Sequence, residues 1–210
     1  MSKPKKKRTK SKSGKTVSSK PTFSERLKSG WQERKDFILF VVGVLGLLGG
    51  FFWLSAWSFY LDYIFTPVTH FYAMASTFIL NLFGMGITVN GEMMVNPAFQ
   101  MSIAKGCDGI APIILLIAGV LMFPSKWKYK WRGIIYGTLA LILLNQIRIV
   151  SLFLFGVYTP NLFDIMHVEV WQALFIATAI LLWLTWLIWA NNQELKVAES
   201  SAKIETNDTH

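Results

Sequence analysis

The chain has 210 residues, of which 53% are hydrophobic, and it contains nine Trp and sixteen Phe. A soluble core of this length needs fewer large apolar side chains, so the composition excludes an ordinary soluble protein and indicates a membrane protein. The net charge of +9 does not indicate a nucleic-acid-binding domain, because thirteen of the 21 Lys and Arg residues lie in residues 1 to 36. We therefore expect membrane lipid, and no nucleic acid, as a partner.

The basic segment 1 to 36 begins with a stretch rich in Lys and Ser, MSKPKKKRTKSKSGKTVSSKP, that is nearly free of large apolar side chains. Such a stretch cannot bury enough surface to fold alone, so we expect a disordered tail. Its charge predicts that the tail is cytoplasmic and contacts anionic lipid.

Three apolar runs are each long enough to cross a bilayer of about 30 Å. They are residues 37 to 60, interpreted as an uncleaved signal anchor, residues 133 to 157, and residues 168 to 190. Together they predict a membrane-embedded domain from 37 to 190, followed by a polar cytoplasmic tail from 191 to 210.

A fourth apolar run, residues 110 to 123, has only fourteen residues. That length suits a partial span or a core helix. The run crosses the membrane only if its helix begins upstream, near Ala104, or continues to Trp127.

Residues 67 to 84 carry an amphipathic helical pattern. The apolar face holds Val68, Phe71, Tyr72, Ala75, Phe78, Ile79, Leu82 and Phe83. Most of the other face is polar, with Thr69, His70, Ser76, Thr77 and Asn81. This pattern predicts a helix in the outer membrane interface, and a fifth transmembrane helix is the alternative.

The loop basic residues bear on that choice. Lys126, Lys128, Lys130 and Arg132 should be cytoplasmic by the positive-inside rule. Because the N-terminal tail is cytoplasmic too, an even number of crossings must separate the two, and five spans in total would place these charges outside. We therefore predict an all-α membrane protein with about four transmembrane helices.

A small β element precedes the fourth apolar run. Residues 85 to 103, MGITVNGEMMVNPAFQMSI, form short alternating runs around Asn90-Gly91. The glycine supplies the positive φ of a tight turn, so the pattern predicts a β-hairpin. With the amphipathic helix it makes an extracytoplasmic region over 61 to 106, placed beside Cys107 as a lid or a substrate edge.

The four-span topology brings the lone cysteine, Cys107, to the outer side together with two other polar groups. Cys107 precedes Asp108, a candidate N-cap, so the thiol would lie near the positive end of a helix dipole, which favours the thiolate. Lys105 would add to this effect.

Arg148 is the second group, and it lies about fifteen residues, or roughly 22 Å, into its span. Inserting a guanidinium at that depth costs on the order of 2.5 to 3.5 kcal/mol, so we expect it to face the helix bundle. Asn145 shares its face and is placed to orient it. The alternative is an arginine that snorkels to the outer headgroups.

His167 is the third group and begins the last span, with Asp164 and Glu169 close by. Beside a cysteine and an arginine, it is the natural general base. His70 is the rival, but on an interfacial helix it marks the water boundary. One cysteine and scattered histidines offer no metal-ligand spacing, so we expect no metal and no other cofactor.

Three motifs occur in order, each at the outer end of a membrane segment: GCDGI at 106 to 110, NQIRIV at 145 to 150 and FDIMHVEVWQ at 163 to 172. They resemble the exosortase/archaeosortase family of prokaryotic membrane proteins, especially its compact, exosortase H-like members. The likeness covers roughly residues 67 to 190. It implies a catalytic set of Cys107, Arg148 and His167.

The resemblance implies a cysteine protease or transpeptidase in the prokaryotic plasma membrane, with an extracytoplasmic active site. Its substrates would be exported proteins that end in a short motif, a transmembrane helix and a basic cluster. Cys107 would form a thioester, Arg148 would stabilise the oxyanion, and His167, oriented by Asp164 or Glu169, would exchange the proton. A non-catalytic membrane scaffold and a small transporter are the alternatives.

Reporter fusions test the predicted topology. Because basic residues cluster at 1 to 36 and 126 to 132, a reporter fused after Lys130 or at the C-terminus should be cytoplasmic. A reporter inserted within 86 to 100 should be external. An external Lys130 fusion would instead support five spans and would place Cys107 on the cytoplasmic side.

Overall fold

The computed structural model describes residues 23–207, so residues 1–22 of the predicted tail lie outside the described residues. The chain divides into two units, Met1–Ile38 and Leu39–His210. In the first unit the described residues belong to helix α1 (Phe23–Ser55). Residues 23–36 are therefore helical, unlike the sequence prediction, because this stretch has several good helix formers and no proline after the start of the helix.

Within residues 23–207, three helical stretches are long and apolar enough to cross a membrane. All elements other than α1 lie in the second unit. The three are Lys35–Ser55 in α1, helix α5 (Trp127–Tyr158), and Pro160–Ser201, which contains most of α7 (Trp171–Asn207). This confirms the prediction of an all-α membrane protein. Because α7 continues to Asn207, the polar stretch after 190 extends the last helix.

Helix α4 (Ile110–Met122) has 13 residues and is shorter than a full span. It reaches neither Ala104 nor Trp127, so neither condition for a full-length fourth span is met. Gly109 precedes it in the left-handed region, with φ 72°, and Phe123 after it is extended. The following residue is a proline, which disfavours helical geometry at the residue before it.

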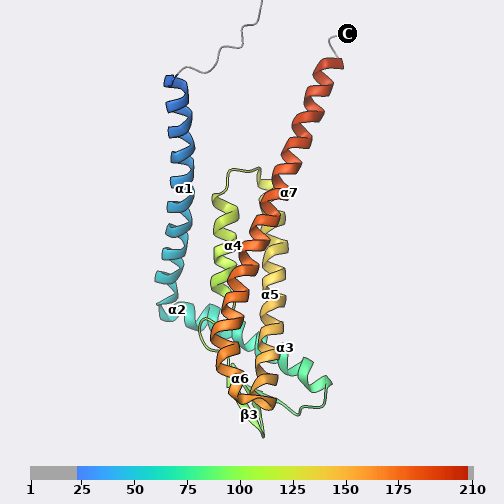
Figure 1. Cartoon of the computed structure of the whole chain (residues 1–210). Coiled ribbons are helices and arrows are strands. Elements are labelled where there is room, and N and C mark those ends of the chain that lie inside the picture. Colours follow the sequence, from blue (N-terminus) through green and yellow to red (C-terminus); the bar gives the residue numbers. More distant parts are fainter. Residues whose placement is uncertain (1–22, 208–210) are drawn as a thin grey trace, which may run out of the picture. The chain divides into compact units, whose positions relative to one another are not determined.

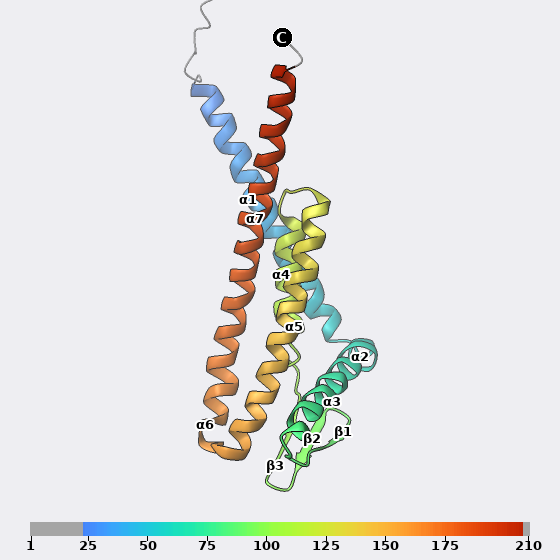
Figure 2. The same ribbon diagram turned by 90° about the vertical axis from the view of Figure 1, so that its right-hand side faces the viewer.

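Helices α4, α5 and α7 pack side by side (Figures 1 and 2). Small residues allow their close approach, as is usual between membrane helices. The indole ring of Trp186 on α7 lies against Gly133 of α5, and its N–H donates to the carbonyl oxygen of Tyr129 at 2.9 Å. Leu116 of α4 lies against Gly137 in the same way. This packing fixes α5 and α7, the helices next to the candidate site.

The chain between α1 and the sheet forms α2 (Ser58–Tyr60), the π-helix η1 (Leu61–Phe65) and α3 (Thr66–Leu82). In Figure 1, α3 crosses near the lower ends of α4, α5 and α7 rather than running alongside them. Among the described helices, α3 is not one of those long and apolar enough to span. This favours the interfacial alternative over a fifth transmembrane helix.

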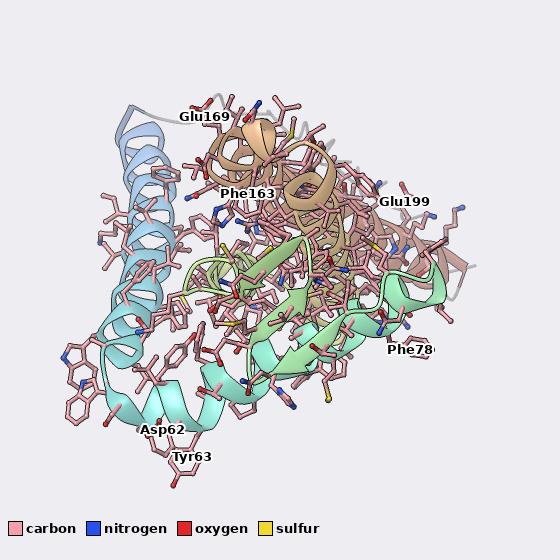
Figure 3. All side chains as sticks on the ribbon, turned by 90° about the horizontal axis from the view of Figure 1, so that it is seen from below. Asp62, Tyr63, Phe78, Phe163, Glu169 and Glu199 are labelled. Atoms are coloured by element: carbon pink, nitrogen blue, oxygen red, sulfur yellow. The ribbon has the colours of Figure 1, made fainter. Side chains whose placement is uncertain are left out.

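The face of α3 that points into the protein carries small polar residues together with the core residues Tyr72, Ala73 and Leu80. Thr69, Ser76 and Thr77 are buried, and the side-chain amide of Gln146 on α5 donates a hydrogen bond to the Ser76 hydroxyl at 2.5 Å. Phe78, which is 67% exposed, points away from the sheet in the view of Figure 3. The large apolar side chains on the outward face, among them Phe71, Phe78 and Leu82, suit a helix that contacts lipid.

The predicted hairpin is confirmed and gains a third strand. Strands β1 (Thr88–Asn90), β2 (Met93–Asn96) and β3 (Phe99–Ser102) form an antiparallel sheet in the order β1-β2-β3. Gly91 begins the two-residue β1–β2 turn with φ 64°, as in type II′ turns. The β2–β3 turn follows from Asn96, whose side chain accepts from the Ala98 N–H at 2.8 Å.

Two α3 side chains hold the β1 side of the sheet in place. The Asn81 amide makes two hydrogen bonds with the main chain of Ile87, at 2.7 and 2.9 Å. Nδ1 of His70 lies 2.7 Å from the carbonyl oxygen of Gly91. His70 therefore anchors the hairpin turn, and the sheet and α3 form one layer at the end of α4 and α5.

Candidate active site

Cys107 and His167 are in direct contact, although 60 residues separate them. Sγ of Cys107, in the loop between β3 and α4, lies 2.6 Å from Nε2 of His167. His167 lies on the π-helix η2 (Ile165–Val170), between α6 (Pro160–Asp164) and α7. Short π-helical segments are rare and are frequent at functional sites.

Arg148 completes this cluster from α5. Its side chain is only 4% exposed, with Nη2 at 3.5 Å from Sγ of Cys107 and 3.4 Å from the carbonyl oxygen of His167. The guanidinium also lies 5.8 Å from the centre of the Phe175 ring on α7. Arg148 therefore faces the bundle, as its insertion cost predicts, and does not snorkel. The structure brings together the three residues that the sequence singles out.

Two glycines shape the loop that carries the thiol. Gly106 and Gly109 have φ values of 88° and 72°, which few other residues adopt. The N-cap of α4 is Gly109, not Asp108 as predicted. Because Gly109 turns the backbone, the Asp108 carboxylate still reaches forward and accepts from the Ile110 N–H at 3.2 Å.

The surroundings of the thiol contradict the expected bias toward the thiolate. Burial raises the pKa of Cys107, the positive charge of Arg148 lowers it, and the nearby Asp108 carboxylate raises it. Lys105 does not add to thiolate formation as predicted. Its ammonium group instead donates to the carbonyl oxygen of Ser55 at 3.0 Å. The half-buried thiol is therefore less acidic than the sequence predicts.

Asn145 acts on the cysteine loop and not on Arg148. Its side chain is fully buried, and a Cβ atom at position 109 would lie only 3.0 Å from Cγ of Asn145. Within the part of the chain that the structure describes, no hydrogen bond joins Asn145 to Arg148, so the predicted orienting contact is absent. Asn145 therefore packs against the start of α4.

Neither predicted carboxylate partner of His167 makes a hydrogen bond with it in the described part of the chain. Asp164 and Glu169 are exposed, and among residues 23–207 neither hydrogen-bonds the imidazole. In Figure 3, Glu169 lies at the rim of the molecule and Phe163 lies nearer the sheet. The His167 ring packs on the Phe163 ring, with 5.6 Å between centroids. The contact that positions the imidazole ring is therefore with an aromatic side chain and not a hydrogen bond to the expected acid.

Phe163 and Phe99 are site residues that the sequence analysis does not identify. The Phe99 ring of β3 lies 5.5 Å from that of Phe163 and also packs beside Gly156 of α5. Phe163 precedes His167 by four residues, and residues four apart are neighbours on a helix, so the sequence spacing could have indicated this contact. Nothing in the sequence indicates the position of Phe99, because it depends on how the sheet packs against the helices. In the described chain, no group of three or more His, Cys, Asp or Glu could hold a metal ion.

The fold and site define a membrane protein with a Cys–His–Arg cluster at one end of a helical bundle. The family model for transmembrane exosortases matches residues 37–184 of the chain. The chain therefore belongs to the transmembrane exosortase family, which confirms the resemblance seen in its motifs. Searches of curated proteins and of solved structures give no match.

Alkylation tests the electrostatics of the thiol. Because Cys107 is the only cysteine, its reaction with iodoacetamide reports the thiolate fraction directly. We expect the rate to rise with pH through a pKa above the ordinary value of about 8.5. Asp108→Asn should lower this pKa because it removes a negative charge but keeps the oxygen that accepts from Ile110. Arg148→Gln should raise it, since a positive charge is lost.

The two variants are controls for each other, because both alter a charge beside the same thiol. A wild-type profile centred below the ordinary cysteine pKa would contradict this description of the site. So would shifts of both variants in the same direction.

Proposed function

We propose that this exosortase-family protein is a membrane-embedded cysteine peptidase or transpeptidase. It cleaves C-terminal sorting signals of exported proteins at the extracytoplasmic face of a prokaryotic plasma membrane. The observation that carries the proposal is the 2.6 Å contact between the Cys107 thiol and Nε2 of His167. Family membership supports this substrate class, because membership of the exosortase family implies that the substrates are exported proteins with sorting signals.

The first half-reaction forms a thioester. Nε2 of His167 takes the thiol proton while Sγ of Cys107 attacks the scissile carbonyl carbon, and the carbonyl oxygen becomes an oxyanion. His167 then gives the proton to the leaving amine as the peptide C–N bond breaks. The leaving fragment carries the apolar helix and the basic end, and the exported protein stays on Cys107.

The second half-reaction releases the exported protein. Water, or an amine of an acceptor, attacks the thioester carbon and passes a proton to His167, which returns it to Sγ as the C–S bond breaks. Water gives a free carboxylate and an amine gives a new amide bond. The same three residues serve both outcomes.

In this proposal, Arg148 stabilises the oxyanion. Its Nη2 is 3.5 Å from Sγ, and the guanidinium is almost completely buried, so its charge acts in a low dielectric. The raised pKa of the half-buried Cys107 thiol also explains why a base is needed. Since burial disfavours a preformed thiolate, His167 must remove the proton during the attack.

Neither alternative function requires this geometry. A scaffold has no use for a cysteine in hydrogen-bonding contact with a histidine. A transporter would need Arg148 on a continuous path across the membrane, whereas its guanidinium is enclosed by Cys107, His167 and Phe175. The cluster therefore favours the enzyme.

Replacing the cysteine tests the proposed chemistry. Cys107→Ala should leave the protein in the membrane at its normal level, while a reporter ending in the sorting signal of an exported protein from the same genome stays full-length on immunoblots. Cys107→Ser should be nearly as inactive, because an alkoxide is much harder to generate than a thiolate. Normal cleavage by both variants would make Cys107 a packed hydrophobic residue.

Replacing the arginine tests the oxyanion role. Arg148→Lys keeps the charge but loses the planar fork of donors, so we expect reporter cleavage to fall by about 10²-fold or more at an unchanged membrane level. Arg132→Lys is the matched control on the same helix, because Arg132 lies over the Trp189 ring, away from the Cys–His contact. Equal cleavage by both variants would count against a catalytic Arg148.

A further inference from the structure

Strand β3 is an edge strand that leads directly to the candidate nucleophile. The sheet order β1-β2-β3 leaves one side of β3 without a neighbouring strand. A short loop then connects Ser102, its last residue, to Cys107. An open strand edge thus lies one loop away from the Cys–His contact.

The register shows which main-chain groups lie on the open side. The Ile103 N–H donates to the carbonyl oxygen of Glu92 at 3.2 Å, so the main-chain N–H and C=O groups of Ile103 point toward β2. In an antiparallel pair, residues whose main-chain groups point toward the neighbouring strand alternate with residues whose groups point away from it. The main-chain groups of Met101 therefore also point toward β2, and those of Gln100 and Ser102 point to the open side. Within the described residues, no hydrogen bond uses the main-chain groups of Gln100 or Ser102 on this side.

The side chains of β3 hold it firmly but leave its edge accessible. Phe99 and Met101 pack on the apolar core, where the Phe99 ring lies 5.6 Å from that of Phe153 on α5. Gln100 and Ser102 are exposed. The strand FQMS has no charge and no proline, the usual means by which proteins protect a free edge from another chain. The strand is therefore held by its packed side chains, and its edge is available for pairing.

Strand β3 is the strand of the sheet that lies nearest to the segment carrying His167. Of the three strands, β3 lies nearest to α6 in Figure 2, and the contact between the Phe99 and Phe163 rings agrees with this. Phe163 in turn packs on His167. A peptide bound along β3 would therefore lie close to the Phe99 and Phe163 rings and, beyond them, to His167.

We propose that the recognition segment of the sorting signal binds in extended form, as a fourth strand on the open side of β3. This rests on the proposed function and adds where the enzyme binds its substrate. Main-chain hydrogen bonds to Gln100 and Ser102 supply affinity, and side-chain contacts with Phe99 and Phe163 supply specificity. Because β3 leads toward Cys107, a peptide with its scissile bond after the recognition residues runs parallel to β3.

A pair of substitutions at one position separates main-chain from side-chain effects. Gln100→Pro removes the outward N–H while the inward N–H groups of β3 remain, and proline is tolerated on edge strands. Gln100→Ala keeps the N–H and is the matched control. For the full-length protein in detergent with the reporter that ends in a sorting signal, we expect Gln100→Pro to raise KM about tenfold with kcat unchanged. Gln100→Ala should stay near wild type.

Two further measurements control for folding and report the contact itself. Both Gln100 variants should show the wild-type rate of Cys107 alkylation by iodoacetamide, which shows that the site is intact. In the inactive Cys107→Ala protein, hydrogen exchange of the Gln100 and Ser102 amides should slow when the reporter is added.

The outcomes separate the two proposals. If the wild-type protein cleaves the reporter, but Gln100→Pro behaves like Gln100→Ala and neither amide gains protection, the strand-addition proposal is wrong and the proposed function stands. If the wild-type protein neither cleaves nor binds the reporter, both are wrong.

Discussion

The buried charge of Arg148 is the constraint on which the rest of the structure depends. A guanidinium that is 4% exposed inside an apolar bundle is costly unless other groups surround it favourably. Here the thiol of Cys107, the carbonyl oxygen of His167 and the ring of Phe175 do so, and they come from three separate segments. Surrounding Nη2 of this one side chain draws the cysteine loop, η2 and α7 together and sets the thiol against the imidazole, while Nε of Arg148 has no hydrogen-bond partner among the described residues.

The rest of the fold holds these segments in position relative to one another. Gly109 lets the chain turn sharply into α4 and leaves space for Asn145, which packs behind the loop. The close packing of α5 and α7, with the Trp186 ring against Gly133, fixes the two helices that carry Arg148 and Phe175. At the end of the bundle that carries the site, α3 turns its small polar residues toward α5 and supports the sheet. The site is therefore a property of the whole bundle and not of one motif.

How far the sequence predicts this site depends on whether each contact has a local cause. The inward position of Arg148 follows from its insertion cost, and the hairpin follows from Asn90-Gly91, so both were predictable. The early end of α4 also had a signal, because Phe123 precedes a proline. The pKa direction of Cys107 did not, since burial depends on tertiary packing, and helix-dipole reasoning omits it. Phe99 and the π-helical turn at His167 likewise arise only in the packed structure.

Mass spectrometry of an acid-quenched reaction tests the central claim most directly. Wild-type protein mixed with the sorting-signal reporter should carry the N-terminal reporter fragment on the peptide that contains Cys107, as a thioester that hydroxylamine releases. His167→Ala should carry none, because the Cys107 thiol, whose pKa is raised, has lost its base. Cleaved reporter without any adduct on Cys107, or an adduct on another residue, would contradict the account.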